Sequence, residues 1–350
     1  MRVSSRSLVA VAALALLTTS LARADDALRW KFKQGDTLQY VSRSKSDVVV
    51  DASGVEFDIS SGQTMDLTWK INKVNDDGSA EVSQRIDRLQ LLINSPLTGE
   101  FRFDSKEAAK EGEEDKDNKQ QAPGPGGQIA ERFLPLLKSM IGQSFTMKIS
   151  PRGEVTDIKL PEKMSEALKK QDSGNNGGGG SFFALLLGGG FSEDGIKQLI
   201  QRSVTLLPEK VPSSDTSWTQ EFSSKLGKIG VQKNATKFSY EGVEEHDGKK
   251  LAKLSTDEEI TLELNDNPDA NFELEIAKQE AKGTIFFDNQ TGRLAEANAT
   301  AKVEMEGEFQ GNDIYQERTT TTLVKQVTSA DLPNEEKAAT DASPGDEDQK

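Results

Sequence analysis

The sequence predicts a β-rich α+β fold, with antiparallel meanders from two related halves and a helical middle section. Three observations support this prediction. Apolar and polar residues alternate with period two through most of residues 28–103 and 218–327, as expected of strands with one buried face. Asp-Gly pairs mark tight turns in both stretches. Between the two stretches, apolar residues recur at helical spacing.

The first meander is predicted for residues 25–104. Its turns include Asp77-Gly78, a pair that suits the positive φ angles of a type I′ connection. An acidic, Pro/Gly-rich linker is predicted for residues 105–127, because this segment has few apolar side chains to bury against a core.

The helical middle section is predicted for residues 128–207. The apolar face of its first helix consists of Phe133, Leu136, Leu137 and Met140. A hairpin follows at residues 145–158, Pro161 opens a second helix, and Ser192 caps a third. Glycine-rich loops precede the third helix, so this section joins the two meanders through short helices and flexible connections.

Residues 208–329 return to the strand pattern, and the acidic tail at residues 330–350 is predicted to be disordered. Residues 74–78 and 243–248 each read as a Val-acidic-Asp-Gly hairpin, and a later hairpin also recurs in each stretch. This order favours two related halves that pack as one unit. The alternative is that such turns recur by chance in any meander.

Residues 1–24 have the features of a bacterial secretory signal peptide. Arg2 and Arg6 precede a ten-residue apolar run, and Ala22-Arg23-Ala24 has the form that signal peptidase cleaves. The run is too short for a permanent membrane anchor. We therefore expect an exported protein that works in the bacterial periplasm or outside the cell.

Charge and cysteine content exclude several classes of protein. The net charge of −15 becomes −18 once the three arginines of residues 1–24 are removed, which disfavours nucleic acid and anionic membrane surfaces as partners. The absence of Cys excludes disulfides, thiolate nucleophiles and sulfur-ligated metals. No later segment reaches the 18 apolar residues of a transmembrane helix, so we expect no anchor after signal removal.

Two segments resemble an exported bacterial family of unknown function. The Trp-Lys-Phe-x-x-Gly-Asp start within residues 28–40 is similar to the opening strand and turn of that family. The Leu-Pro…Asp-x-x-Trp element within residues 206–218 is similar to its mid-chain motif, with Ser214 where Gly is usual. The hairpin at residues 284–294 also fits. The resemblance implies an exported β-rich protein and supplies no catalytic residues.

The residues that carry chemistry in other proteins are sparse or poorly placed. His246, the only histidine, precedes Asp247-Gly248 in a turn that we expect to be solvated, whereas a Ser-His-Asp triad needs a water-poor cleft. One histidine without cysteine disfavours zinc and copper sites, and no cofactor is expected. The oxygen-rich residues 265–273 have the spacing of a calcium loop but lack its glycine and contain Pro268, which favours a polar turn.

The strongest candidate for a ligand contact is an apolar segment between two glycine tracts. It contains Phe182, Phe183, Leu185, Leu186 and Leu187. The segment would serve as a mobile flap over an apolar cavity or a membrane surface, or it is a helical part of the core.

The sequence therefore favours a non-enzymatic binding or carrier protein of the cell envelope with an apolar ligand such as a lipid. The alternative is a protein-interaction or assembly module that uses exposed strand edges and the linkers. A hydrolase is a third reading, because 58 acidic residues leave paired catalytic carboxylates open.

Overall fold

The computed structural model describes residues 27–96, 99–107, 134–135, 137–173, 193–225, 230–264, 272–309 and 311–328. The strands are β1 (Thr37–Ala52), β2 (Val55–Val74), β3 (Ala80–Ser95), β4 (Gly99–Asp104), β5 (Ser144–Ile149), β6 (Val155–Lys159), β7 (Ser217–Lys225), β8 (Gly230–His246), β9 (Lys249–Leu264), β10 (Phe272–Asp288), β11 (Arg293–Phe309) and β12 (Asn312–Val327). Two helices are α3 (Glu162–Ser173) and α5 (Glu193–Arg202). The predicted signal peptide, most of the predicted linker, the glycine tracts around residues 182–187 and the predicted tail lie outside these residues.

All the strands belong to one 12-stranded antiparallel sheet. Its order is β6-β5-β3-β2-β1-β12-β11-β10-β9-β8-β7, and β4 pairs with β3. The first and last strands are neighbours, because residues 39–52 of β1 pair with residues 314–327 of β12. The β-rich, antiparallel part of the prediction is confirmed, and the two predicted meanders form one continuous sheet.

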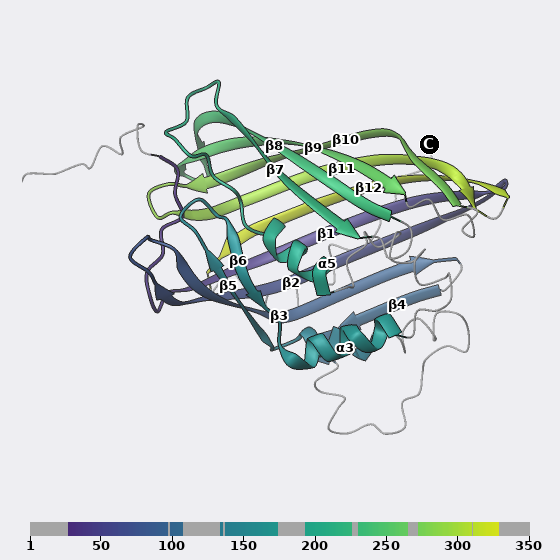
Figure 1. Cartoon of the computed structure of the whole chain (residues 1–350), viewed down its shortest axis with the longest axis horizontal. Coiled ribbons are helices and arrows are strands. Elements are labelled where there is room, and N and C mark those ends of the chain that lie inside the picture. Colours follow the sequence, from purple (N-terminus) through teal and green to yellow (C-terminus); the bar gives the residue numbers. More distant parts are fainter. Residues whose placement is uncertain are drawn as a thin grey trace, which may run out of the picture.

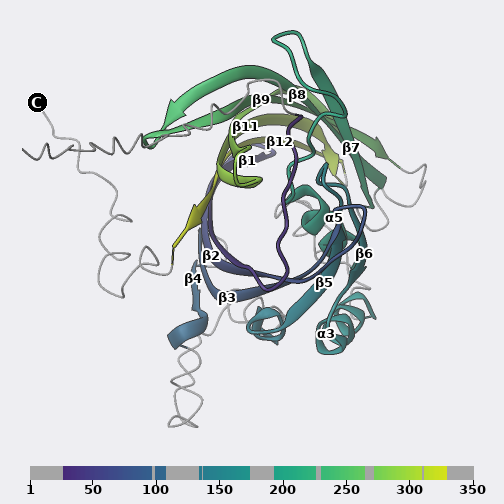
Figure 2. The ribbon, with the colours of Figure 1, turned by 90° about the vertical axis from the view of Figure 1, so that its left-hand side faces the viewer.

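The sheet curls strongly, so that its two edge strands, β6 and β7, face one another across helix α5 (Figures 1 and 2). The helix contacts the backbone of both edges. The Gln201 side chain donates to the Val155 carbonyl of β6 at 3.4 Å, and the Gln198 side chain donates to the Ser223 carbonyl of β7. Covering an open edge in this way limits pairing with other chains.

The main hydrophobic core lies at one end of the curled sheet, which we call the core end. The segment before β1 crosses the mouth of the sheet at this end (Figure 2). Trp30 of this segment is 2% exposed, and its indole donates to the Thr205 carbonyl at 2.9 Å. Its ring lies 6.0 Å from that of Trp69 and 5.3 Å from that of Phe287, so it joins both sides of the sheet. Ile196 and Ile200 of α5 belong to the same core.

A smaller cluster covers β3 and β4 on the same face of the sheet. Ile86, Leu89 and Phe103 pack there with Leu137, and Met140 packs against them from the helical residues 137–140. Leu137 and Met140 of the predicted apolar helix face therefore pack into the core. Phe133 and Leu136 lie outside the described residues.

The predicted turn type at Asp77-Gly78 is wrong. Only Gly78 has a positive φ, of 78°, and the loop closes through a 2.8 Å hydrogen bond from the Asn75 amide to the Ser79 carbonyl. The Asp77 carboxylate instead accepts from the Ser79 amide at 2.9 Å, a local bond that holds Asp77 at negative φ. Asp247 and Gly248 both have positive φ, 49° and 73°, as a type I′ turn requires.

An ionic cluster lies on the opposite face of β2, β3 and β4. Arg88 binds Asp104 through two nitrogens, at 2.7 and 3.2 Å, and Gln90 donates to the same carboxylate at 2.9 Å. Asp66, opposite Arg88, is 7% exposed, and its Oδ1 has no hydrogen-bond partner. Burial raises the pKa of Asp66, although the positive charge of Arg88 opposes this shift.

Replacing Asp66 by Asn should stabilise the protein at neutral pH. A carboxyl whose pKa is raised by folding favours the folded state below its unfolded pKa, near 3.8, and loses that contribution as pH rises through the folded value. We expect the melting temperature of Asp66→Asn to exceed that of the parent at pH 7, with the difference shrinking towards pH 3.

Asp104→Asn is the matched control. Burial alone would raise the pKa of Asp104, but hydrogen bonds from Arg88, the Lys106 amide and Gln90 lower it overall. The Asp104 carboxylate therefore contributes to the free energy of unfolding above its unfolded pKa, and this contribution is lost as pH falls through the folded pKa. Asp104→Asn should therefore be less stable than the parent at pH 7. If both variants changed the melting temperature in the same direction and by the same amount, the charge environment assigned to Asp66 would be wrong.

Trp30→Ala should lower the free energy of unfolding by about 3–5 kcal/mol, because it opens a cavity at the core end. Trp30→Phe keeps most of the ring contacts and loses the bond to Thr205, so it should cost about 1–3 kcal/mol. Urea denaturation measures both values. A loss below about 1 kcal/mol for Trp30→Ala would mean that the sheet closes without this residue.

Candidate ligand-binding face

The concave face of the sheet continues well beyond the core. Side chains alternate between the two faces of a strand, and Leu38 and Tyr40 of β1 lie in the core on the concave face. Every second residue that follows them in β1 therefore points to the concave face as well. Residues paired with these on the neighbouring strands point to the same face. The end that contains the β1–β2 and β11–β12 hairpins is called the far end.

At the far end, the concave face carries apolar side chains that belong to neither core cluster. We call this surface the apolar wall. It consists of Val48, Val50, Phe57, Ile59, Ile260, Leu262, Leu274, Ile276, Val303, Met305 and Ile314. Val48, Val50, Val303 and Met305 are buried, and the other seven are half-buried. The apolar wall therefore spans β1, β2, β9, β10, β11 and β12.

A band of small residues, which we call the Ser/Thr band, separates the apolar wall from the main core along β1, β11 and β12. Ser44 and Ser46 of β1 lie opposite Thr322 and Thr320 of β12, with hydroxyl oxygens 3.5 and 3.1 Å apart. Ala299 of β11 lies in the same band and is exposed. These side chains are too short to fill the curve of the sheet, which leaves the apolar wall distinct from the packed core.

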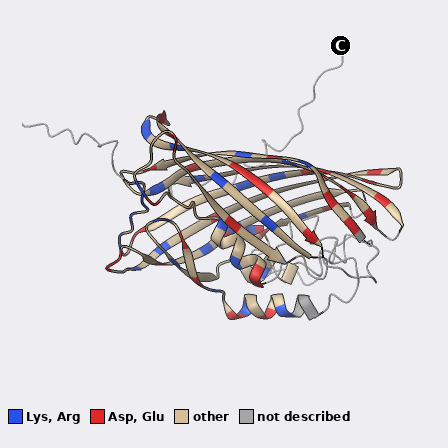
Figure 3. Ribbon diagram, turned by 45° about the horizontal axis from the view of Figure 1, so that its top comes forward, with Lys and Arg blue, Asp and Glu red and all other residues tan. Residues whose placement is uncertain are grey.

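Charged residues concentrate on the convex face. At the far end of β10 and β11 this surface is acidic, with Glu275 opposite Glu306 and Glu273 opposite Glu308 (Figure 3). Like charges in opposite positions of a sheet disfavour folding by themselves. Charged side chains therefore lie mainly on the convex face, and the concave face at the far end is mainly apolar.

The sheet is weakened between β9 and β10 beside the apolar wall. Their ladder ends at the pair Asp257 and Lys282. Beyond it, the Gln279 side chain accepts from the Ile260 amide at 2.8 Å and donates to the Ile260 carbonyl at 3.0 Å. A single side-chain amide therefore replaces a strand ladder at this position.

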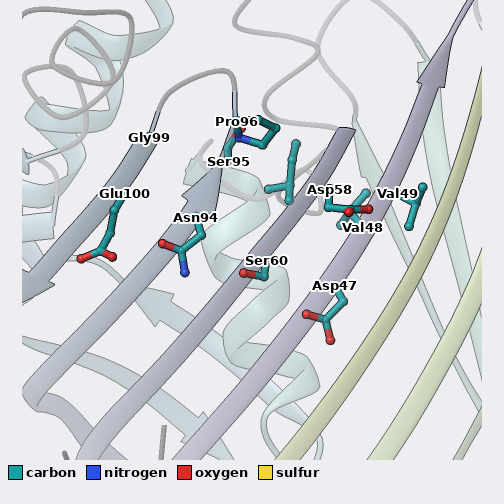
Figure 4. A pocket seen from close by; sticks show the side chains of 11 residues that line it. Asp47, Val48, Val49, Asp58, Ser60, Asn94, Ser95, Pro96, Gly99 and Glu100 are labelled. Atoms are coloured by element: carbon teal, nitrogen blue, oxygen red, sulfur yellow. The ribbon is translucent and has the colours of Figure 1, made fainter. Parts of the chain in front are cut away.

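A cavity of about 520 Å³ lies at the far end of β1, β2, β3 and β4. Asp47, Ser60, Asn94 and Glu100 form a row across these strands on the convex side (Figure 4). Both acids are exposed, and Asp47 already forms a 3.0 Å ion pair with Lys45. The two carboxylates of this row therefore face solvent.

The ligand contacts predicted from sequence, Phe182, Phe183, Leu185, Leu186 and Leu187, lie outside the described residues, and they stay a prediction. The apolar wall was missed. One signal could have found it, because Val48, Val50, Phe57 and Ile59 extend the period-two pattern of the core beyond the length that the core needs.

A family model for proteins of unknown function matches residues 77–319, which is more than half of the chain. The chain belongs to this family, DUF6263. The expected resemblance to such a family is confirmed, although the opening motif at residues 28–40 precedes the matched residues. A search of curated proteins found no match to this DUF6263 chain.

Three solved structures are similar to this DUF6263 chain at low identity. Lipovitellin, from a structure that describes lipid–protein interactions, matches with a TM-score of 0.37 and 12% identity over 87% of this chain and 27% of its own. DynF, from the dynemicin biosynthesis pathway of Micromonospora chersina, has a TM-score of 0.21 and 7% identity, with 88% of both chains covered. An outer membrane channel from Pseudomonas putida F1 has a TM-score of 0.22 and 8% identity, covering 87% of this chain and 98% of its own. These scores are too low to carry an argument about function.

In the described part of the chain, no helix has the length and hydrophobicity needed to cross a membrane.

His246 is not solvated as we expected. Its ring stacks on Phe286 with 3.8 Å between centroids and 7° between planes, because the β8–β9 hairpin folds against the neighbouring strands. Its Nε2 lies 3.5 Å from Glu296. Asp247 and Glu296 both pair with Lys325, at 2.8 and 3.0 Å. His246, Asp247 and Glu296 together resemble a metal-ligand set, and the Lys325 ammonium lies between the two carboxylates as their cation.

Lys325→Met should create a zinc site in place of this ion pair. The variant leaves an imidazole and two carboxylates within 4.8 Å of one another without a competing cation, and both donor types bind Zn²⁺. Calorimetric titration should show Zn²⁺ binding at least about tenfold tighter than in the parent.

His246→Gln in the Lys325→Met background should remove that gain, because it deletes the nitrogen ligand. Equal Zn²⁺ affinity of the parent and Lys325→Met would contradict the role assigned to Lys325.

Proposed function

We propose that this protein is an exported, non-enzymatic binding protein of the bacterial cell envelope that carries an apolar ligand such as a lipid. The apolar wall is the single observation that supports this function best. Eleven apolar side chains line one concave surface and belong to neither core cluster, and the Ser/Thr band separates them from the main core along β1 and β12. A core needs no such separation, whereas a carrier needs an apolar surface that the ligand covers.

The region around Gln279 supports the same proposal. A ligand on the concave face needs a route to it, and β9 and β10 are joined there by one side-chain amide instead of a ladder. Separation of these two strands would break two hydrogen bonds and leave the core end intact.

The assembly module expected as the alternative has less support. It relies on exposed strand edges, and α5 covers the facing edges of the sheet through Gln198 and Gln201.

We also propose that the two meanders are related halves. In the sheet, the order β7 to β12 is followed directly by β1, β2, β3, β5 and β6, so β2 and β3 hold the positions in their meander that β8 and β9 hold in theirs. The recurring Val-acidic-Asp-Gly hairpins join these corresponding pairs, although their turn types differ.

Mass spectrometry of organic extracts of the purified protein, together with titration of an apolar fluorescent dye, tests the carrier function. We expect a co-purifying lipid and saturable dye binding. Phe57→Asp and Leu262→Asp, on opposite sides of the apolar wall, should each weaken dye binding at least about tenfold, because each places a charge on the binding surface.

Val243→Asp is the matched control, because Val243 is a strand residue that is 55% exposed and lies outside the apolar wall. It should bind the dye as the parent does. Absence of both lipid and dye binding in the parent would refute the proposed function.

A further inference from the structure

Gln316 is a polar side chain buried within the apolar wall. It lies on the concave face of β12, and its register partners are Val50 of β1 and Met305 of β11. All three side chains are buried, and Gln316 is 3% exposed. β12 is a middle strand of the wall, since β1 and β2 lie on one side of it and β11, β10 and β9 lie on the other. The amide of Gln316 therefore lies in the middle of the proposed binding surface.

The Nε2 of Gln316 has no hydrogen-bond partner. Buried groups of this kind are rare, because they lose their hydrogen bonds to water and gain none in return. Two other glutamines on the concave face are paired. Gln279 donates to the Ile260 carbonyl at 3.0 Å, and Gln232 donates to the Asn234 side chain at 2.9 Å. Neighbouring groups thus satisfy an amide elsewhere on this face, and they leave the donor of Gln316 unmet.

Packing alone does not account for an amide at this position. An apolar residue between Val50 and Met305 would fill the same space without an unmet donor. A glutamine is favourable here when a molecule on the wall brings an acceptor to it. The missing partner of Gln316 is therefore an acceptor oxygen of a bound ligand.

The charged side chains of the concave face bear on whether this acceptor is charged. On the described strands, the registers place on this face Glu245, Lys250, Glu258 and Arg318. Glu245 and Lys250 are register partners of opposite charge near the core end. Glu258 pairs with Arg202 of α5 at 2.5 Å. Arg318 is half-buried and has an interaction of its own. These charges therefore have neighbours within the protein, and the unmet donor in the wall is a neutral amide.

An uncharged ligand suits this environment better than an anion. A carboxylate or phosphate placed between Val50 and Met305 would give up its hydration for a bond from a neutral amide. The net charge of −15, which is −18 without the three arginines of residues 1–24, also repels an anion. An ester carbonyl is an acceptor that carries no charge.

We propose that the ligand is an uncharged lipid ester, whose carbonyl oxygen accepts a hydrogen bond from Gln316 while its hydrocarbon chain covers the apolar wall. The carbonyl satisfies the buried donor and brings no N–H or O–H that would need a further acceptor. The inference rests on the proposed carrier function and names the chemical class of its ligand.

The test measures displacement of the apolar dye at pH 7 by three probes of matched chain length. They are the methyl ester of a long-chain fatty acid, the free acid and the corresponding alkane. The parent protein should bind the ester more tightly than the acid, because the acid must bury a charge. This comparison needs no variant.

Gln316→Met keeps the length of the side chain and removes its donor. The ratio of the ester affinity to the alkane affinity should fall roughly three- to tenfold in this variant, as expected for the loss of one hydrogen bond. Both affinities are measured on the same variant, so a general loss of binding cancels in the ratio.

Gln326→Met is the matched control. It makes the same substitution on the same face of β12, but at the core end opposite Tyr40 and outside the apolar wall. The ratio should stay at the parent value. Thermal melts check the folding of both variants.

The outcomes separate the two proposals. Tighter binding of the acid than of the ester, or an ester-to-alkane ratio that Gln316→Met leaves unchanged or lowers no more than Gln326→Met does, overturns the ester site and leaves the carrier function standing. Absence of binding of ester, acid, alkane and dye overturns the carrier function itself.

Discussion

The pairing of β1 with β12 is the interaction on which the rest of the structure depends. It joins the first strand to the last and turns two meanders into one curved surface. It also brings Val48 beside Arg318 and Val50 beside Gln316, so both halves of the apolar wall meet at this ladder. Without it, each meander would present another open edge, and neither would be wide enough to curl around α5.

The concave side of the sheet has a packed core at one end and the apolar wall at the other. Large aromatic side chains fill the core end, where Trp30 joins both sides of the sheet. The Ser/Thr band adds little apolar contact, and the apolar wall lies beyond it. A side chain on the wall can therefore change without removing the contacts that hold the core end closed.

Local patterns were enough to predict the strand content and two helices. Period-two alternation and the signals at Pro161 and Ser192 depend on neighbouring residues alone, and α3 and α5 begin directly after the expected positions. The environment of His246 was not predictable in this way. It is set by Phe286 and Glu296, which lie on strands that only the sheet register brings close.

Arg318 is a second residue whose environment the sequence predicts only in part. It is an even number of positions from Ile314, Thr320 and Val324 in β12, so the alternation alone predicts that it lies on the same face as they do. Its neighbours Val48 and Val303 come from the first and the eleventh strands, and no local pattern names them. The surroundings of Arg318 are therefore set by strand topology and not by a sequence motif.

The meeting of the first and last strands also makes the described chain suitable for circular permutation. Gln39 lies opposite Val327, so the two outer ends of the strand sequence lie side by side at the core end. A short linker there, with new termini in the connection between β6 and β7, would give a chain in which β1 follows β12 directly. The central β1–β12 pair would then be local in sequence, and chains with more local pairs fold faster than those that must first close a chain-long loop.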